Sequence, residues 1–116
     1  MQLRDKTTLK KILVAIDEAI EVFGDSKKEK LLTSKVLKLS MAMSVIRVGE
    51  LVKALTLEFR RNNPQVPWRV IAGYRDVAAH KYETLDFSRV YITITEEFPE
   101  LKLQIENILR SDENDD

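Results

Sequence analysis

The stretch 74–82, YRDVAAHKY, contains residue types that can carry out acid–base chemistry on a phosphodiester. His80 is the only histidine of the chain, and Arg75 precedes it by five residues. An imidazole accepts and releases protons near neutral pH, and a guanidinium binds a phosphate and stabilises the charge of its transition state. In RNA the 2′-hydroxyl can supply the nucleophile, so no metal is strictly required. The alternative is an ordinary solvated helix end.

The spacing of these residues limits how they can meet. In a regular helix, positions five apart differ in direction by roughly 140°, so Arg75 and His80 do not share a face. A loosened helix end or a second copy of the chain could bring them together. Asp76 lies four residues before His80 and shares its face, so its carboxylate could orient the imidazole. Tyr82 follows His80 by two residues.

The composition excludes several other kinds of site. The chain has no cysteine and one histidine, which excludes disulfides and thiolate metal sites, and we expect no metal and no cofactor. The first residues, MQLRDKTTLKK, lack the apolar core of a signal peptide, and no apolar run is long enough to cross a membrane. We therefore expect a cytoplasmic protein that does not bind membranes.

The formal charge is zero but unevenly distributed. Residues 47–82 carry seven basic and three acidic side chains, whereas residues 83–116 carry three basic and ten acidic ones. The basic segment contains the Arg75–His80 stretch and could attract phosphates. The other interpretation is two differently charged solvated faces.

Apolar spacings of three and four predict an all-α protein, an antiparallel bundle of four to five helices. We expect helices over 9–23, from about 27 to 61 with a break near Thr33–Ser34, over 68–80, and from an N-cap at Asp86 onward with a kink or division at Pro99. We expect residues 1–110 to form a single domain and residues 111–116 to form an acidic, frayed tail.

Glu50 and Gly49 stand out within the predicted long helix. Glu50 continues an apolar stripe that runs through Val36, Leu39, Met43 and Ile46. It is either partly buried beside a partner or extended to solvent from the edge of the stripe. Gly49 lowers helix propensity by roughly 1 kcal/mol relative to alanine, and one use for it is the close approach of another backbone.

Three stretches of the sequence resemble a known family. "NPQVPWRVIAGYRDVAAHKY" resembles the signature of the HepT-like branch of the HEPN family, with Arg75-x4-His80-x-Tyr82 at its centre. "VIRVGELVKAL" resembles the long-helix motif of that family, and "DFSRVYITITEEFPELKLQIENIL" resembles its C-terminal helices. The likeness covers nearly the whole chain.

The resemblance implies a HEPN-like helical bundle that forms a homodimer, in which two Arg-x4-His motifs meet at a cleft between subunits. It also implies the toxin of a toxin–antitoxin pair, acting as a metal-independent RNA endonuclease. The partner it implies is a minimal nucleotidyltransferase antitoxin that attaches AMP to the family's tyrosine and so silences the toxin.

Transferred by position, the family roles make His80 the proton-transfer residue, Arg75 the phosphate binder, Asp76 a supporting polar residue and Tyr82 the AMPylation site. Glu50 matches a recurring acid whose role is not defined. A second class of function stays open, in which the chain is a non-catalytic helical subunit that presents substrate to, or regulates, a nucleotidyltransferase.

Overall fold

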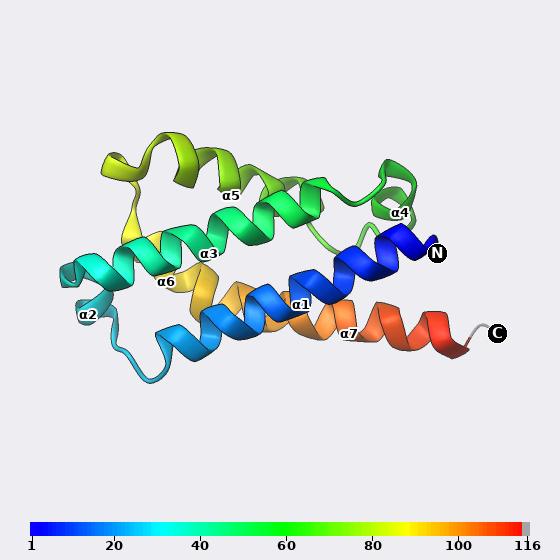
Figure 1. Ribbon diagram of the computed structural model, residues 1–116, viewed down its shortest axis with the longest axis horizontal. Helices are drawn as coiled ribbons and strands as arrows, with labels where there is room; N and C mark the ends of the chain where they lie inside the picture. The colour runs from blue at the N-terminus through cyan, green and yellow to red at the C-terminus, as the bar shows by residue number, and fades with distance from the viewer. Residues whose placement is uncertain (115–116) are drawn as a thin grey trace.

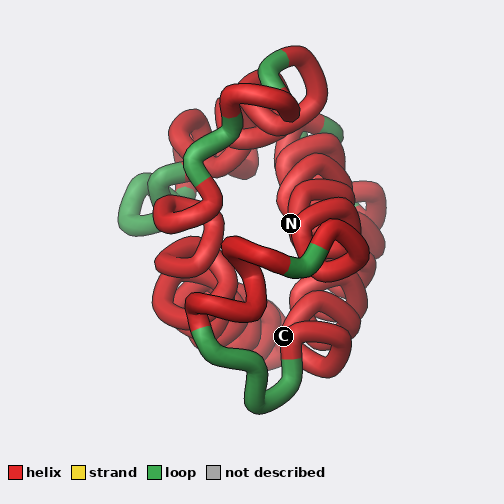
Figure 2. Tube along the Cα trace, turned by 90° about the vertical axis from the view of Figure 1, so that its left-hand side faces the viewer, coloured by secondary structure: helices red, strands yellow, loops and turns green. Residues whose placement is uncertain are grey.

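The protein is an elongated bundle of antiparallel helices, seen in a computed structural model that describes residues 1–114. Its principal extents are 49 × 28 × 20 Å. The helices run back and forth along the long axis, so the N-terminus and the end of the last helix lie at one end of the bundle (Figure 1). A view along the bundle shows helices joined by short loops, and no strand occurs in residues 1–114 (Figure 2). The all-α prediction is confirmed.

Seven α-helical segments account for most of residues 1–114. Their bounds are α1 Leu3–Phe23, α2 Lys28–Thr33, α3 Lys35–Lys53, α4 Leu57–Asn62, α5 Trp68–His80, α6 Phe87–Ile92 and α7 Phe98–Asn114. A short 3₁₀ turn, η1, spans Tyr82–Thr84, and a π-helical turn, η2, spans Thr93–Glu97 between α6 and α7. Helix α3 packs against α1 on one side and α5 on the other.

Capping residues explain where several helices begin. The predicted break at Thr33–Ser34 is present, because Ser34 Oγ accepts a hydrogen bond from Leu37 N at 3.1 Å and starts α3. Asp86 caps α6 as expected, accepting from Ser88 N at 2.9 Å. These side-chain acceptors satisfy amides that the first turn of a helix leaves without a partner.

Two predicted boundaries need correction. The first helix begins at Leu3 rather than at residue 9. The long helix expected to reach about residue 61 ends at Lys53, and α4 starts again at Leu57. The buried Asp5 explains the second break, because its carboxylate accepts hydrogen bonds from Thr56 N at 2.8 Å and Thr56 Oγ1 at 2.7 Å. Thr56 Oγ1 in turn accepts from Phe59 N and caps α4.

The C-terminal helical region is divided close to Pro99, as predicted. The π turn Thr93–Glu97 lies immediately before it, and proline both lacks an N–H and crowds the preceding turn. Helix α7 continues to Asn114, four residues beyond the expected boundary at 110. Residues 115 and 116, the rest of the predicted tail, lie outside the described part of the chain.

The core lies between α1, α3 and α7, with α5 against α3. Apolar residues of these helices fill it, including Ile12, Ile16, Met41, Val48, Val52, Leu101 and Ile105, all 3% exposed or less. The predicted stripe of Val36, Leu39 and Met43 on α3 is exposed instead of packed in this core. Trp68 at the start of α5 is buried, and its indole Nε1 donates to the carbonyl of Asn63 at 2.9 Å. Val77 on the same helix is 48% exposed.

Candidate active site

Helix α5 carries both Arg75 and His80, but the two side chains do not meet within one chain. Arg75 lies on the side of α5 that faces α3, where it contacts Gly49 and pairs with Glu50. His80 is the last residue of α5 and is exposed. Within residues 1–114 the imidazole makes no hydrogen bond or ion pair. The awkward spacing of five residues is therefore not resolved by a local distortion of α5.

Gly49 allows α5 to approach α3 closely at Arg75. A methyl group built on Gly49 would lie 2.6 Å from Arg75 Cβ and 3.1 Å from Arg75 N. Side chains essentially never approach one another so closely, so any larger residue would force the helices apart. The close backbone approach expected at this glycine is confirmed. It fixes the position of the Arg75 backbone relative to α3, and therefore the region that the guanidinium can reach.

Arg75 is held by two carboxylates. Its Nε donates to Glu50 Oε1 on α3, and its Nη1 donates to Asp76 Oδ1 at 3.0 Å. The Glu50 carboxylate is about half exposed, so it extends from the stripe edge to solvent and is not buried in the core. The arginine side chain is 31% exposed, which leaves its guanidinium accessible from solvent.

Asp76 binds cations rather than the imidazole that the four-residue spacing suggested. Its Oδ1 accepts from Arg75 Nη1 and also from Lys53 Nζ at 3.2 Å. These hydrogen bonds, from Arg75 first and Lys53 second, lower the pKa of Asp76 below its ordinary value. Hydrogen bonds to Asp76 and Glu50 raise the pKa of Arg75. The site therefore holds a charged arginine within a neutral group of two cations and two anions.

Lys53 is the member of this group that sequence reasoning missed. It is the last residue of α3 and lies three positions after Glu50, so the two residues share a side of the helix. That spacing was the available signal. By itself it did not indicate a contact with Asp76, because the sequence does not show that α5 crosses α3 at this point.

Tyr82 lies beyond the end of α5, in the turn η1. Its ring is half-buried and meets Phe87 of α6 edge to face, with ring centroids 5.8 Å apart. This contact fixes the turn that follows His80. The chain thus presents the imidazole and the phenol close together in sequence at one end of α5, with the Arg75 group about one to two helical turns away.

A second polar network attaches α5 on its other side. Tyr74 donates its hydroxyl hydrogen to Glu97 Oε2 in the π turn at 2.9 Å, and Arg89 Nη2 donates to both groups at 2.9 Å. Thr93 Oγ1 donates to the other oxygen, Glu97 Oε1. Tyr74, the residue before Arg75, thus connects α5 to the C-terminal helical region by hydrogen bonds.

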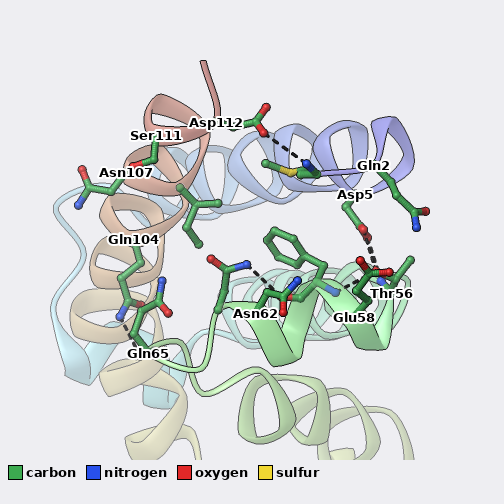
Figure 3. Close-up of a pocket in the computed structure, with 14 residues that line it drawn as sticks. Gln2, Asp5, Thr56, Glu58, Asn62, Gln65, Gln104, Asn107, Ser111 and Asp112 are labelled. Carbon is green, nitrogen blue, oxygen red and sulfur yellow. Dashed lines mark hydrogen bonds and ion pairs between the residues drawn. The ribbon is translucent and has the colours of Figure 1, made fainter. Parts of the chain in front are cut away.

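A cavity of about 460 Å³ lies away from this group, formed by the beginning of α1, α4 and α7 (Figure 3). Its polar lining comes largely from side-chain amides, including Asn62, Gln65 and Gln104. None of the five candidate residues Glu50, Arg75, Asp76, His80 and Tyr82 lines it, and Asp5 in its wall is engaged by Thr56.

Residues 1–114 contain no group of three or more histidine, aspartate or glutamate side chains arranged to hold a metal ion. Over the same residues, no helix combines the length and the apolar character needed to cross a bilayer.

Comparison with known proteins assigns the chain to a family. The family model described as "Ribonuclease HepT-like" matches residues 12–108. A protein of Caldanaerobacter subterraneus subsp. tengcongensis, named as a candidate RNase, is 35% identical over 90% of this chain and 93% of its own length. The "Probable ribonuclease HepT" of Thermococcus cleftensis is 31% identical over 89% of this chain and 97% of its own length.

A protein of Methanocaldococcus jannaschii, also named as a candidate RNase, is 31% identical over 96% of this chain and 92% of its own length. No solved structure matches the chain significantly. The family match covers α3, α5 and η1 completely, and with these elements every candidate site residue. The chain therefore belongs to the HepT-like ribonuclease family.

Proposed function

We propose that the protein is a metal-independent RNA endonuclease whose reaction centre contains Arg75 and His80. Membership of a ribonuclease family sets the substrate class. The observation that carries the assignment of residues is that α5 presents an unpartnered, exposed imidazole at its end while the same helix holds a charged guanidinium between two carboxylates. These are the groups that proton transfer and phosphate binding require.

The proposed reaction is a transesterification within the RNA strand. His80 accepts the proton of the 2′-hydroxyl as its oxygen forms a bond to phosphorus. The bond from phosphorus to the 5′-oxygen breaks, and that oxygen takes a proton from a protonated imidazole or from water. The products are a 2′,3′-cyclic phosphate and a 5′-hydroxyl. Arg75 donates to the non-bridging oxygens, where negative charge is concentrated in the transition state.

The arrangement within one chain favours a homodimeric site. Arg75 and His80 point in different directions on α5, so a second copy is needed to place one chain's imidazole near the other chain's guanidinium. Helix α3, which also carries Glu50, has an apolar stripe that no other element of residues 1–114 covers, with Val36 76%, Leu39 52% and Met43 63% exposed. Exposed apolar stripes of this kind are typical of interfaces.

The biological role we propose is that of a toxin controlled by a nucleotidyltransferase antitoxin. Tyr82 is the proposed acceptor of AMP. An anionic adduct there would repel RNA and obstruct access to His80. The support for this role is the Arg75-x4-His80-x-Tyr82 arrangement together with the half-buried Tyr82 ring, which keeps part of its surface open to solvent.

The test of the nuclease function is cleavage of single-stranded RNA in EDTA by purified protein whose intact mass shows no adduct. We expect cleavage by the wild type, a loss of about 10²-fold or more in Arg75→Ala and His80→Ala, and normal activity in Arg110→Ala, which removes an exposed arginine from α7. No cleavage by the folded, unmodified protein across several RNAs would favour the non-catalytic regulatory subunit.

The test of the antitoxin relationship uses co-expression with the candidate nucleotidyltransferase. We expect AMP on the peptide that contains Tyr82, no addition in Tyr82→Phe, and normal addition in Tyr91→Phe. Expression of the chain alone should arrest growth, and co-expression should restore it. Addition of AMP at another residue, with Tyr82 unmodified, would contradict the assignment of Tyr82.

A further inference from the structure

A shallow groove of about 530 Å³ lies between α4 and the beginning of α5, separate from the Arg75 group. Three arginines line it, Arg60 and Arg61 near the end of α4 and Arg69 in the first turn of α5. Apolar surface from Leu57, Pro64 and Val70 completes its walls. None of these residues was among the candidates that the sequence suggested.

The arginines of this groove are not engaged in ion pairs within residues 1–114. Among residues 1–114, none of the three arginines forms an ion pair, whereas Arg47, Arg75 and Arg89 are each paired with a glutamate. Arg60 Nε is also buried without a hydrogen-bond partner, a condition that costs free energy. Three like charges on one small surface repel each other, and a polyanion would relieve that repulsion.

The start of α5 adds donors to the same surface. Pro67 occupies the N-cap position and provides no side-chain cap. The amide of Trp68 donates to the carbonyl of Val66 at 2.9 Å, whereas within residues 1–114 the amides of Arg69 and Val70 have no partner and can bind an anion. Arg69 belongs to this first turn. Its guanidinium and the amide ends of the helix therefore favour the same kind of ligand as Arg60 and Arg61.

The groove is aligned with His80 along α5. Arg69, Asp76 and His80 are separated by seven and four residues, spacings that place them on one face of a helix. Arg69 and His80 are eleven residues apart in sequence, which corresponds to about 16 Å along the helix axis. An extended strand with one phosphate at His80 can therefore reach the groove a few nucleotides away.

We propose that the Arg60–Arg61–Arg69 groove binds the phosphodiester backbone of the RNA strand at a distance from the bond that is cut. This inference rests on the proposed nuclease function for its ligand. The arginines bind phosphates without regard to sequence, and the apolar walls accommodate sugar or base surface. The groove thus selects strands long enough to extend along α5.

The experiment measures binding of non-cleavable, 2′-O-methylated single-stranded RNA by fluorescence anisotropy over a range of salt concentrations. The variant is Arg61→Ala/Arg69→Ala, which removes two exposed charges. The matched control is Lys10→Ala/Lys11→Ala, which removes two exposed charges from α1. We expect at least a tenfold loss of affinity at low salt in the groove variant only, with the slope of log K against log salt smaller by about 1.4.

A dinucleotide, which cannot span from His80 to the groove, is the second probe. Its weaker binding should be equal in the wild type and in the groove variant. Unchanged affinity for the long strand in Arg61→Ala/Arg69→Ala, or an equal loss in Lys10→Ala/Lys11→Ala, would overturn the proposal. So would a groove variant that binds RNA normally but no longer binds an acidic protein partner.

The measurement separates the groove from the nuclease function. RNA binding that depends on Arg61 and Arg69 supports the proposed role of the groove even if the wild type does not cut RNA. The absence of cleavage would then count only against the proposed reaction centre. If cleavage depends on His80 but RNA affinity is unchanged in the groove variant, the proposed reaction centre is supported and the proposed role of the groove is overturned.

Discussion

Gly49 of α3 lies directly against Arg75 of α5, so close that a methyl group on the glycine would be 2.6 Å from Arg75 Cβ. The neighbouring atoms include the Arg75 backbone, which cannot rotate away. This contact sets the separation of α3 and α5 at the point where Glu50 pairs with Arg75. The position of the proposed phosphate-binding group therefore depends on the absence of a side chain at residue 49.

Gly49→Ala should lower the free energy of unfolding by about 1–3 kcal/mol, because the cost of overpacking exceeds the gain in helix propensity. It should also reduce RNA cleavage. Gly73→Ala is the matched control, since no atom outside its own helix lies within 4 Å of the added carbon, and it should raise the unfolding free energy by up to about 1 kcal/mol. Urea denaturation measures both, and a stabilised Gly49→Ala would contradict the close contact.

Lys53 should assist Arg75 through Asp76, whose Oδ1 accepts from both cations. A phosphate must replace the carboxylates that hold Arg75, and Lys53 can keep Asp76 neutralised while this happens. In Lys53→Met, Arg75 becomes the only cation on Asp76, so we expect KM for RNA to rise about twofold to fivefold with kcat nearly unchanged.

A double-mutant cycle separates this positioning role from direct phosphate binding by Lys53. In the Asp76→Asn background, Lys53→Met should change KM much less than in the wild type, because the carboxylate on which it acts is gone. Lys53→Arg should restore the wild-type KM. Equal effects of Lys53→Met in both backgrounds would mean that Lys53 acts on RNA without Asp76.

The apolar stripe on α3 should be the surface at which two copies associate. Light scattering should give a mass near twice the 13.4 kDa of the chain. Met43→Glu should yield a folded monomer with strongly reduced RNA cleavage, since a charge in the stripe opposes burial. Leu103→Glu, at an exposed leucine of α7 that is 58% exposed, should leave mass and activity unchanged. A wild-type monomer that cleaves RNA would remove the shared site.

The Tyr74–Arg89–Glu97 network should make stability depend on pH in the acid range. Burial acts to raise the pKa of Glu97, but hydrogen bonds from Tyr74, Arg89 and Thr93 outweigh it and hold that pKa below its ordinary value of 4.5. The unfolded state therefore binds the proton more readily, so the stabilisation is present above pH 4.5 and is lost as the pH falls further.

Glu97→Gln should flatten the acid limb of a plot of unfolding free energy against pH. Glu96→Gln, which changes an exposed carboxylate beside it, should keep the wild-type slope. Identical slopes in the wild type and Glu97→Gln between pH 3 and 5 would show that the network contributes nothing to the pH dependence. Tyr74 has a pKa raised by burial and by Glu97, so its protonated form, the one that donates to Glu97, persists through neutral pH.

The amino-acid sequence by itself determined the helical class, the position of α5, the break at Thr33–Ser34, the cap at Asp86 and the placement of Arg75 and His80 on one helix. These features depend on local periodicity and on hydrogen bonds between residues a few positions apart. Even so, local signals did not reveal the break at 54–56, because it is stabilised by Asp5, 51 residues away from Thr56.

Only the tertiary structure decided which groups meet. The pairing of Glu50 with Arg75, the joining of Lys53 to Asp76, the network of Tyr74 and Glu97, and the exposed arginines around the start of α5 all depend on how helices cross and on their relative register. Helical periodicity gives the direction of a side chain from its own axis. It does not give the angle or distance at which another helix packs, and this depends on details such as the missing side chain at Gly49.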